Sequence, residues 1–370
     1  MSVLKLLVCA IVLILPPVNP KRPDTSRLSR GPVWTSFQSL KLDAAQVAKA
    51  TVDARQRKRI AIVAQDADGK QNEPLVYAML LASELSYHPK LLVTDFMTSR
   101  QIFAECTTVE SCALAAAKYE IDKVVWCSKQ GSVLKANILD RSSPDASLVL
   151  EDINTEKSWL ADVPQRRSEL LDKLGLNSRS RTQQVQSLPS QNIVALTGLA
   201  RANIEAAALA VLSDVEAQKA GCNRAIAVLD EAIKNDPNLI EAYILKASCQ
   251  DELGLEGNVK QTLRDAFSKR NAVKLDPLAN LELEADYSRF CLNDIDAALE
   301  RYSKMAEMDS SNLKANWGLV DIILTGNGST RPGQEDMSEA AKLAAILVSH
   351  HPQSGVAQAI QAQALVRRPD

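Results

Sequence analysis

The sequence predicts an α+β protein, in which an N-terminal mixed αβ sheet domain is followed by an all-α region of paired helices. Two observations favour this fold class. Between residues 59 and 176, short apolar runs rich in β-branched residues alternate with amphipathic stretches, which is typical of a sheet with helices packed against it. From residue 191 onwards the apolar residues keep a helical spacing to the end of the chain.

The composition argues against several classes of protein. The chain has 370 residues, of which 46% are hydrophobic and 24% charged, as in a soluble globular protein long enough for two domains. Lys and Arg number 43 against 45 for Asp and Glu, so no overall basic field favours a nucleic acid as partner. With 4% aromatic residues and three histidines, we expect neither a base-stacking surface nor a histidine-rich metal centre.

Residues 1–20 contain the most membrane-like run. Lys5 precedes an apolar core from Leu6 to Leu15, which is shorter than the roughly 20 residues of a spanning helix. The length suits a secretory signal peptide or a short membrane anchor, although no small-residue cleavage site follows and basic residues crowd the far side. The alternatives are an anchor that faces the cytoplasm, a start codon placed too late, and a soluble cytoplasmic protein. We expect membrane association through it and a place in the cell envelope, periplasmic, membrane-anchored or secreted.

The predicted sheet domain spans residues 59–176, after a linker and lead-in helix at 21–58. Strands are expected at 59–65, 90–96, 122–130, 132–141 and 147–153. Helices are expected at 74–88, 97–105, 112–120 and 156–174. Gly175 then provides a C-cap signal. The expected order is β-α-β-α-α-β-β-β-α, a mixed sheet with helices against it.

The stretch AAAKYEIDKVVWCSKQGSVLKANILDR joins a small-residue helix to a D-x-V-V strand and a hairpin. Together with the preceding strand, helix and strand, it resembles the N-terminal domain of the TolB family and its relatives among curli-secretion and flagellar outer-membrane lipoproteins. Cys127 and Ser128 replace the glycine usual after the VV strand. The resemblance implies a docking module rather than an enzyme; an αβ sandwich of another lineage is the alternative.

Seven cysteines occur without a CxxC pair or zinc-like spacing, so we expect no metal site. Cys106 and Cys112 enclose a loop with Thr and Ser that leads into a predicted helix. Such a loop can bring two sulfurs together, which predicts a disulfide in an oxidising compartment, with two free thiols as the alternative. Residues 177–190 are polar, lack glycine and include Pro189, which predicts a linker.

The region 191–370 carries a helical pattern that repeats about every 34 residues. The segment DEAIKNDPNLIEAYILKASCQDELG at 230–254 strongly resembles a tetratricopeptide repeat (TPR). Small Ala232 allows neighbouring helices to approach, and Pro237 ends one helix before the next. Further copies are expected at 240–275, 279–312 and 313–352, with a capping helix at 356–366. Alanine-rich hairpins without repeats are the alternative.

The TPR resemblance implies a curved stack of helix pairs, whose first helices line an open groove for a peptide or a partner's helix. Carried over residue by residue, the pattern assigns six residues to this groove: Glu241, Ser248, Asp251, Lys314, Trp317 and Asp321. The third copy is off register by one residue and receives no assignment. Trp317 is the expected anchor, because an indole offers both apolar area and a donor; packing inside the array is its alternative role.

No nucleotide-binding, zinc-protease or serine-hydrolase motif is present, so we assign no catalytic residue and expect no cofactor. The sequence therefore predicts a non-enzymatic scaffold of the cell envelope. It would bind a protein or peptide partner through the groove and the αβ domain, with no nucleic acid or small-molecule substrate. One alternative is the sensor or output half of a membrane-bound signalling or transcription regulator that has lost its effector domain. Another is an enzyme with a site between the two domains.

Overall fold

The computed structural model describes residues 52–53, 56–64, 72–86, 88, 90–94, 99, 102–103, 106, 108–141, 143–156, 159–176, 188–206, 215–273, 275–309, 312–325, 334–350, 352 and 355–366. The predicted segment 1–20 and most of the predicted linkers 21–58 and 177–190 lie outside these residues, as does most of the predicted helix 97–105. Within the described part, no helix combines the length and apolar character needed to cross a membrane.

The N-terminal half contains a mixed sheet in the order β2-β1-β3-β4-β5, with β6 paired to β4. β1 runs parallel to β2 and β3, whereas β3, β4 and β5 are antiparallel neighbours. The strands are β1 (Lys58–Ala64), β2 (Leu91–Val93), β3 (Lys123–Gln130), β4 (Val133–Asp140), β5 (Ser143–Val149) and β6 (Ile153–Asn154). The prediction of a mixed sheet is therefore confirmed.

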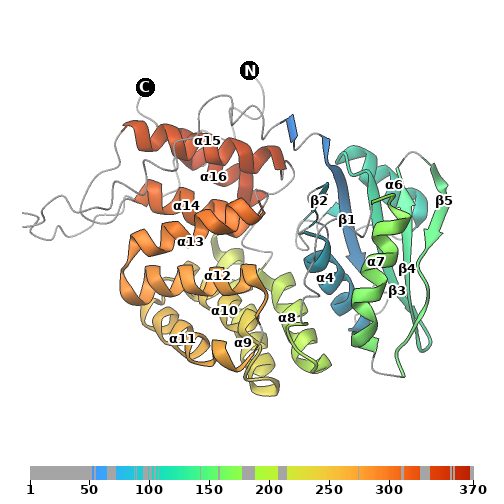
Figure 1. The fold of residues 1–370 in the computed structure, drawn as a ribbon, viewed down its shortest axis with the longest axis horizontal. Helices are drawn as coiled ribbons and strands as arrows, with labels where there is room; N and C mark the ends of the chain where they lie inside the picture. Colours follow the sequence, from blue (N-terminus) through green and yellow to red (C-terminus); the bar gives the residue numbers. More distant parts are fainter. Residues whose placement is uncertain are drawn as a thin grey trace, which may run out of the picture.

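Helices cover both faces of the sheet: α4 (Glu73–Ser86), α6 (Val109–Lys118) and α7 (Val163–Lys173). Because side chains of a strand alternate between faces, Ile60 and Ile62 of β1 join the apolar core with α4 and α7. Ala61 and Val63 belong to a separate core with α6. Figure 1 shows α4 on the side of the sheet that faces the helical region.

Two predicted boundaries in this half are wrong. The strand predicted at 147–153 is instead β5, which starts at Ser143, followed by the short β6. Pro144 obscures this strand in the sequence, but β5 is paired to β4 at the end of the described sheet, and an edge strand tolerates proline. The helix predicted at 156–174 begins as a 3-10 turn, and α7 starts only at Val163, where Pro164 occupies the first turn.

The C-terminal half is entirely helical in its described part. Its helices are α8 (Ile193–Ala206), α9 (Val215–Asn235), α10 (Ile240–Glu252), α11 (Glu256–Lys269), α12 (Pro277–Asp286), α13 (Ile295–Met308), α14 (Leu313–Thr325), α15 (Gln334–His350) and α16 (Gly355–Val366). Each helix packs against the next one along the chain. α8 also touches α10, α10 touches α12 and α14 touches α16. The helices are stacked on one side of the molecule, with the sheet on the other (Figure 1).

Local sequence explains where these helices begin and how closely they pack. Asn192, Asp276 and Asp294 accept backbone hydrogen bonds at the starts of α8, α12 and α13, which satisfies otherwise unpaired N–H groups. A Cβ added at Gly198 of α8 would lie 2.7 Å from the Cβ of Ala232 in α9. Two small residues therefore allow these helices to approach closely.

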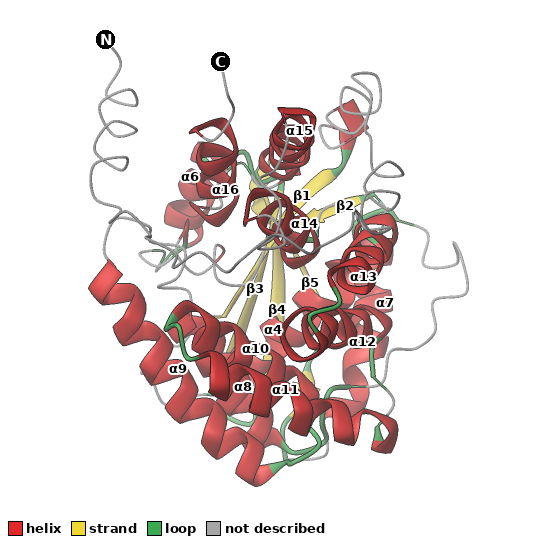
Figure 2. Ribbon diagram, turned by 90° about the vertical axis from the view of Figure 1, so that its left-hand side faces the viewer, coloured by secondary structure: helices red, strands yellow, loops and turns green. Residues whose placement is uncertain are grey.

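The sheet domain and the helical region are packed against each other through α4 and α8. Arg201 of α8 donates a hydrogen bond to Asn72 Oδ1 at 2.7 Å, just before α4. A single apolar core continues from the sheet through α4 into α8, α9 and α10. Figure 2 shows the helical array in front of the strands. The two predicted domains thus share one core.

Candidate functional site

A cavity of about 430 Å³, here named the central cavity, lies between the helical region and α4. Its wall is formed mainly by α8, α10, α12 and α14, the first helices of the successive pairs. Residues of α4 close the side towards the sheet: Met79, Leu80 and Ser83. The inner face that the sequence predicts to be an open groove is therefore partly covered by the sheet domain.

All six residues predicted for the groove come together at this cavity. Five of them line it: Glu241, Ser248, Asp251, Lys314 and Trp317. The sixth, Asp321, is ion-paired with Arg289, which also lines the cavity. Trp317 is 37% exposed, so it is not packed inside the array.

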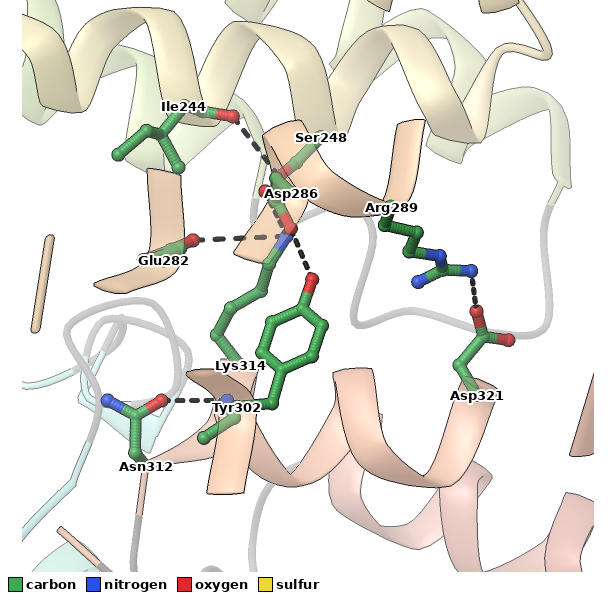
Figure 3. Close-up of polar contacts among 10 residues, drawn as sticks. Ile244, Ser248, Glu282, Asp286, Arg289, Tyr302, Asn312, Lys314 and Asp321 are labelled. Atoms are coloured by element: carbon green, nitrogen blue, oxygen red, sulfur yellow. Dashed lines mark hydrogen bonds and ion pairs between the residues drawn. The ribbon is translucent and has the colours of Figure 1, made fainter. Parts of the chain in front are cut away.

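Lys314 connects α14 to α10 and α12. Asn312 Oδ1 accepts a backbone hydrogen bond at 2.9 Å, which caps α14 and sets Lys314 in its first turn. Lys314 Nζ donates to Ser248 Oγ at 3.1 Å and lies 3.3 Å from Asp286 Oδ2 (Figure 3). Glu282 Oε1 is 3.8 Å from the same nitrogen. Burial lowers the pKa of Lys314, but Asp286 and Glu282 together outweigh it, so the pKa is raised and the ammonium stays charged.

Tyr302 of α13 holds Asp286 from another direction. Its hydroxyl donates a hydrogen bond to Asp286 Oδ1, and both side chains are buried (Figure 3). The ring fits because α14 has glycine at position 318, where an added Cβ would lie 2.6 Å from the ring of Tyr302. Asp286 therefore has both a cation and a hydroxyl donor, which compensates the burial of its charge.

The second cation of the central cavity comes from a π-helical turn, η4 (Tyr287–Leu292), which continues α12. Such wider turns reorient side chains and are frequent at functional sites. This one ends at Asn293, whose φ of 53° is left-handed, and it carries Arg289 and Phe290 to the cavity wall. Arg289 is paired with Asp321 of α14 (Figure 3).

Two further glutamates of the cavity have strongly altered acidity. Burial raises the pKa of Glu241 to about 7. Burial also raises the pKa of Glu282 to about 7, although Lys314 opposes the shift. Each of these glutamates makes ionisation of the other less favourable, because like charges repel. Near neutral pH this part of the cavity can thus gain or lose protons.

The sequence assigns no groove residue to the third helix pair, yet Glu282, Asp286 and Arg289 line the cavity. A signal existed for one of them: Glu282 lies 34 residues after Ser248, one repeat period further along. For the α4 residues no signal existed, because nothing in the repeat pattern indicates what covers its inner face.

Cys106 and Cys112, the predicted disulfide pair, are free thiols in the structure. Cys112 is buried in α6, and its pKa is raised first by burial and then by a hydrogen bond with Cys106. The sulfurs are thus neighbours, but the disulfide itself stays a prediction. Cys222 and Cys249 form a second hydrogen-bonded pair, between α9 and α10, which their sequence spacing does not indicate.

Among the described residues, no group of three or more His, Cys, Asp or Glu side chains is arranged to hold a metal ion. No protein-family model matches the chain, and no curated protein matches it.

Proposed function

We propose that this protein is a non-enzymatic scaffold of the cell envelope, and that its helical region is a TPR-like array that binds a protein partner at the central cavity. One observation carries the proposal: residues assigned to a groove from the resemblance to tetratricopeptide repeats, on α10 and α14, line the same cavity. The sheet domain would be the docking module that its resemblance to TolB N-terminal domains implies. The N-terminal segment would hold the protein near a membrane.

The size and lining of the cavity support binding. Its volume of about 430 Å³ falls in the range of roughly 300–1,000 Å³ that is usual for binding sites. Polar groups from three helices converge on it beside a partly exposed indole, Trp317. Large aromatic side chains of this kind supply much of the energy of protein interfaces.

The test is a quantitative capture experiment with the tagged full-length chain in extracts and membrane fractions of its native cells. Wild type, Trp317→Ala and Leu114→Ala are compared, since Leu114 is 73% exposed on α6, outside the cavity. The partner is then purified, and its affinity for each variant is measured by calorimetry. We expect Trp317→Ala to weaken binding at least about tenfold and Leu114→Ala to leave it unchanged.

Two results would contradict the proposal. One is a purified partner that binds Trp317→Ala as tightly as wild type. The other is a partner that depends on Leu114 and not on Trp317, because binding would then use the outer surface of the sheet domain.

A further inference from the structure

The central cavity carries more negative than positive charge. Among the described residues that line it, five are carboxylates: Glu241, Asp251, Glu252, Glu282 and Asp286. Two of the described lining residues are cations, Lys314 and Arg289. An occupant that brings positive charge would therefore be favoured over a neutral or acidic one.

Both cations already have partners within the protein. Lys314 is held by Asp286 and Glu282, and Arg289 is held by Asp321. In the part of the chain that the structure describes, Glu241 has no ion-pair partner. The existing cations thus leave part of the acidic wall uncompensated.

Within the described residues, one carboxylate oxygen of Glu241 lacks a hydrogen-bond donor. Its Oε2 atom is buried and accepts no hydrogen bond from any residue that the structure describes. A buried acceptor without a donor lowers stability, by more when it is charged, so such atoms are rare in folded proteins. Glu282 of α12 lies close enough to Glu241 for their charges to interact. A cation placed between these two carboxylates would donate to Glu241 Oε2 and relieve the repulsion between the two negative charges.

The wall next to Glu241 is apolar. Ile244 and Leu245 follow it by one helical turn on α10 and line the cavity, and Met79 and Leu80 of α4 line it as well. Lysine and arginine suit such a combination, because their long aliphatic stems pack on apolar surface while the charged head meets acceptors. The cavity has the size of a small-ligand site. An occupant supplied by a protein partner therefore has to be a side chain or a short segment.

We propose that the central cavity receives a lysine or arginine side chain from a short segment of the partner protein, with the cationic head between Glu241 and Glu282 and the stem along the apolar wall. This inference rests on the proposed function, and adds to it the chemistry of the partner. The head donates hydrogen bonds to Glu241 Oε2, and such charge-assisted bonds are stronger than neutral ones.

The test uses three pools of capped heptapeptides that differ only at the central position: lysine or arginine, norleucine, or glutamate. Full-length protein is equilibrated with each pool by dialysis, and bound peptides are identified by mass spectrometry. We expect the basic pool to be retained at least about tenfold better than the norleucine pool.

A matched pair of variants tests whether the preference for basic peptides depends on Glu241. Glu241 and Glu256 both stand in the first turn of a helix, α10 and α11, but Glu256 does not line the cavity. We expect Glu241→Gln to remove most of the preference for basic peptides, and Glu256→Gln to preserve it. Because Glu241 gains its proton readily in the folded protein, Glu241→Gln should fold normally, and circular dichroism checks this.

Several outcomes would overturn the inference. These are equal retention of the basic and norleucine pools, an unchanged preference in Glu241→Gln, or no retention of any pool. Tight binding of free spermidine without binding of basic peptides would instead identify a small amine as the occupant. The proposed function fails separately, when the captured partner binds the Trp317→Ala variant as tightly as wild type.

Discussion

The sheet domain and the central cavity differ in whether a buried carboxylate is paired with a cation. In the sheet domain, Glu84 of α4 lies 3.4 Å from Arg167 of α7, with side-chain exposures of 7% and 10%. In the described part of the cavity, Glu241 has a buried oxygen and no ion-pair partner. Burial raises the pKa of both glutamates, but for Glu84 the charge of Arg167 opposes the shift.

This difference separates a structural ion pair from a candidate binding site. A buried pair compensates its own desolvation, so it needs nothing from outside the chain. An unpaired buried acid costs stability, and groups of this kind concentrate where a protein binds or reacts. The comparison also makes opposite predictions for neutralising a charge in the two regions.

The largest expected effect is in the sheet domain. Replacing Arg167 by leucine leaves the Glu84 carboxylate buried without its cation, which should lower the free energy of unfolding by roughly 3–5 kcal/mol. Urea denaturation at pH 7 measures this. The double variant Arg167→Leu with Glu84→Leu should recover most of the loss. A loss below about 1 kcal/mol in the single variant would show that the pair behaves like a surface salt bridge.

A smaller loss of unfolding free energy is expected at Gly318, which makes room for the Tyr302 ring that holds Asp286. In Gly318→Ala the new methyl group meets the Tyr302 ring, which should cost about 1–3 kcal/mol of unfolding free energy. Gly257→Ala in α11 is the control, since its Cβ would meet nothing within 4 Å and should not lower stability. Similar melting temperatures for both variants would be inconsistent with the close approach of α14 to Tyr302.

Neutralising Glu241 should raise stability instead of lowering it, and the size of the gain should depend on pH. The pKa of Glu241 is about 7 in the folded protein, above its ordinary value of 4.5, so the folded state binds the extra proton. Wild-type stability from this group therefore falls as pH rises from about 4.5 to 7. Glu241→Gln cannot titrate, and it should be more stable than wild type at pH 8 by about 3 kcal/mol at most.

At pH 5 the stabilities of Glu241→Gln and wild type should be nearly equal, because the folded carboxyl group is then neutral. Thermal unfolding at both pH values, with Glu256→Gln as the control, measures the difference. The same change in stability at pH 5 and pH 8 would mean that Glu241 is not held in the environment described.

The smallest effect on stability is expected at the anchor. Because 37% of Trp317 is exposed, Trp317→Ala should shift the melting temperature by only a few degrees while it weakens partner binding. Differential scanning calorimetry provides the melting temperature. A large drop would identify Trp317 as part of the core and leave the cavity without its anchor.

Local patterns explain which parts of the fold could be predicted. Helix starts at Ile240 and Ile295 follow from apolar spacing and from the residues before them, because a helix depends mainly on its own sequence. The same holds for β1 and β3, whose β-branched runs are buried. The start of β5 is predicted wrongly, since Pro144 signals a break and it is the pairing with β4 that shows an edge strand accommodating the proline.

The cavity could be predicted only in part. The resemblance to tetratricopeptide repeats assigns Ser248 and Lys314 to the groove, and these residues meet at 3.1 Å although 66 residues separate them. The pattern assigns no residue to the third helix pair because that copy is off register, and the π-helical turn that carries Arg289 cannot be recognised from periodicity. Coverage by α4 depends on packing between distant elements, which no local pattern encodes.

The most direct measurement is site-specific photo-crosslinking from position 317. A photoreactive phenylalanine analogue replaces Trp317 in the full-length chain, the complex with the captured partner is irradiated, and the joined peptides are sequenced. We predict a crosslink to one short partner segment that contains lysine or arginine. The crosslink should be lost when that residue is changed to methionine, which has an unbranched side chain without a charge. Crosslinks only within the chain itself, to α4 for example, would contradict the claim that the central cavity receives a partner.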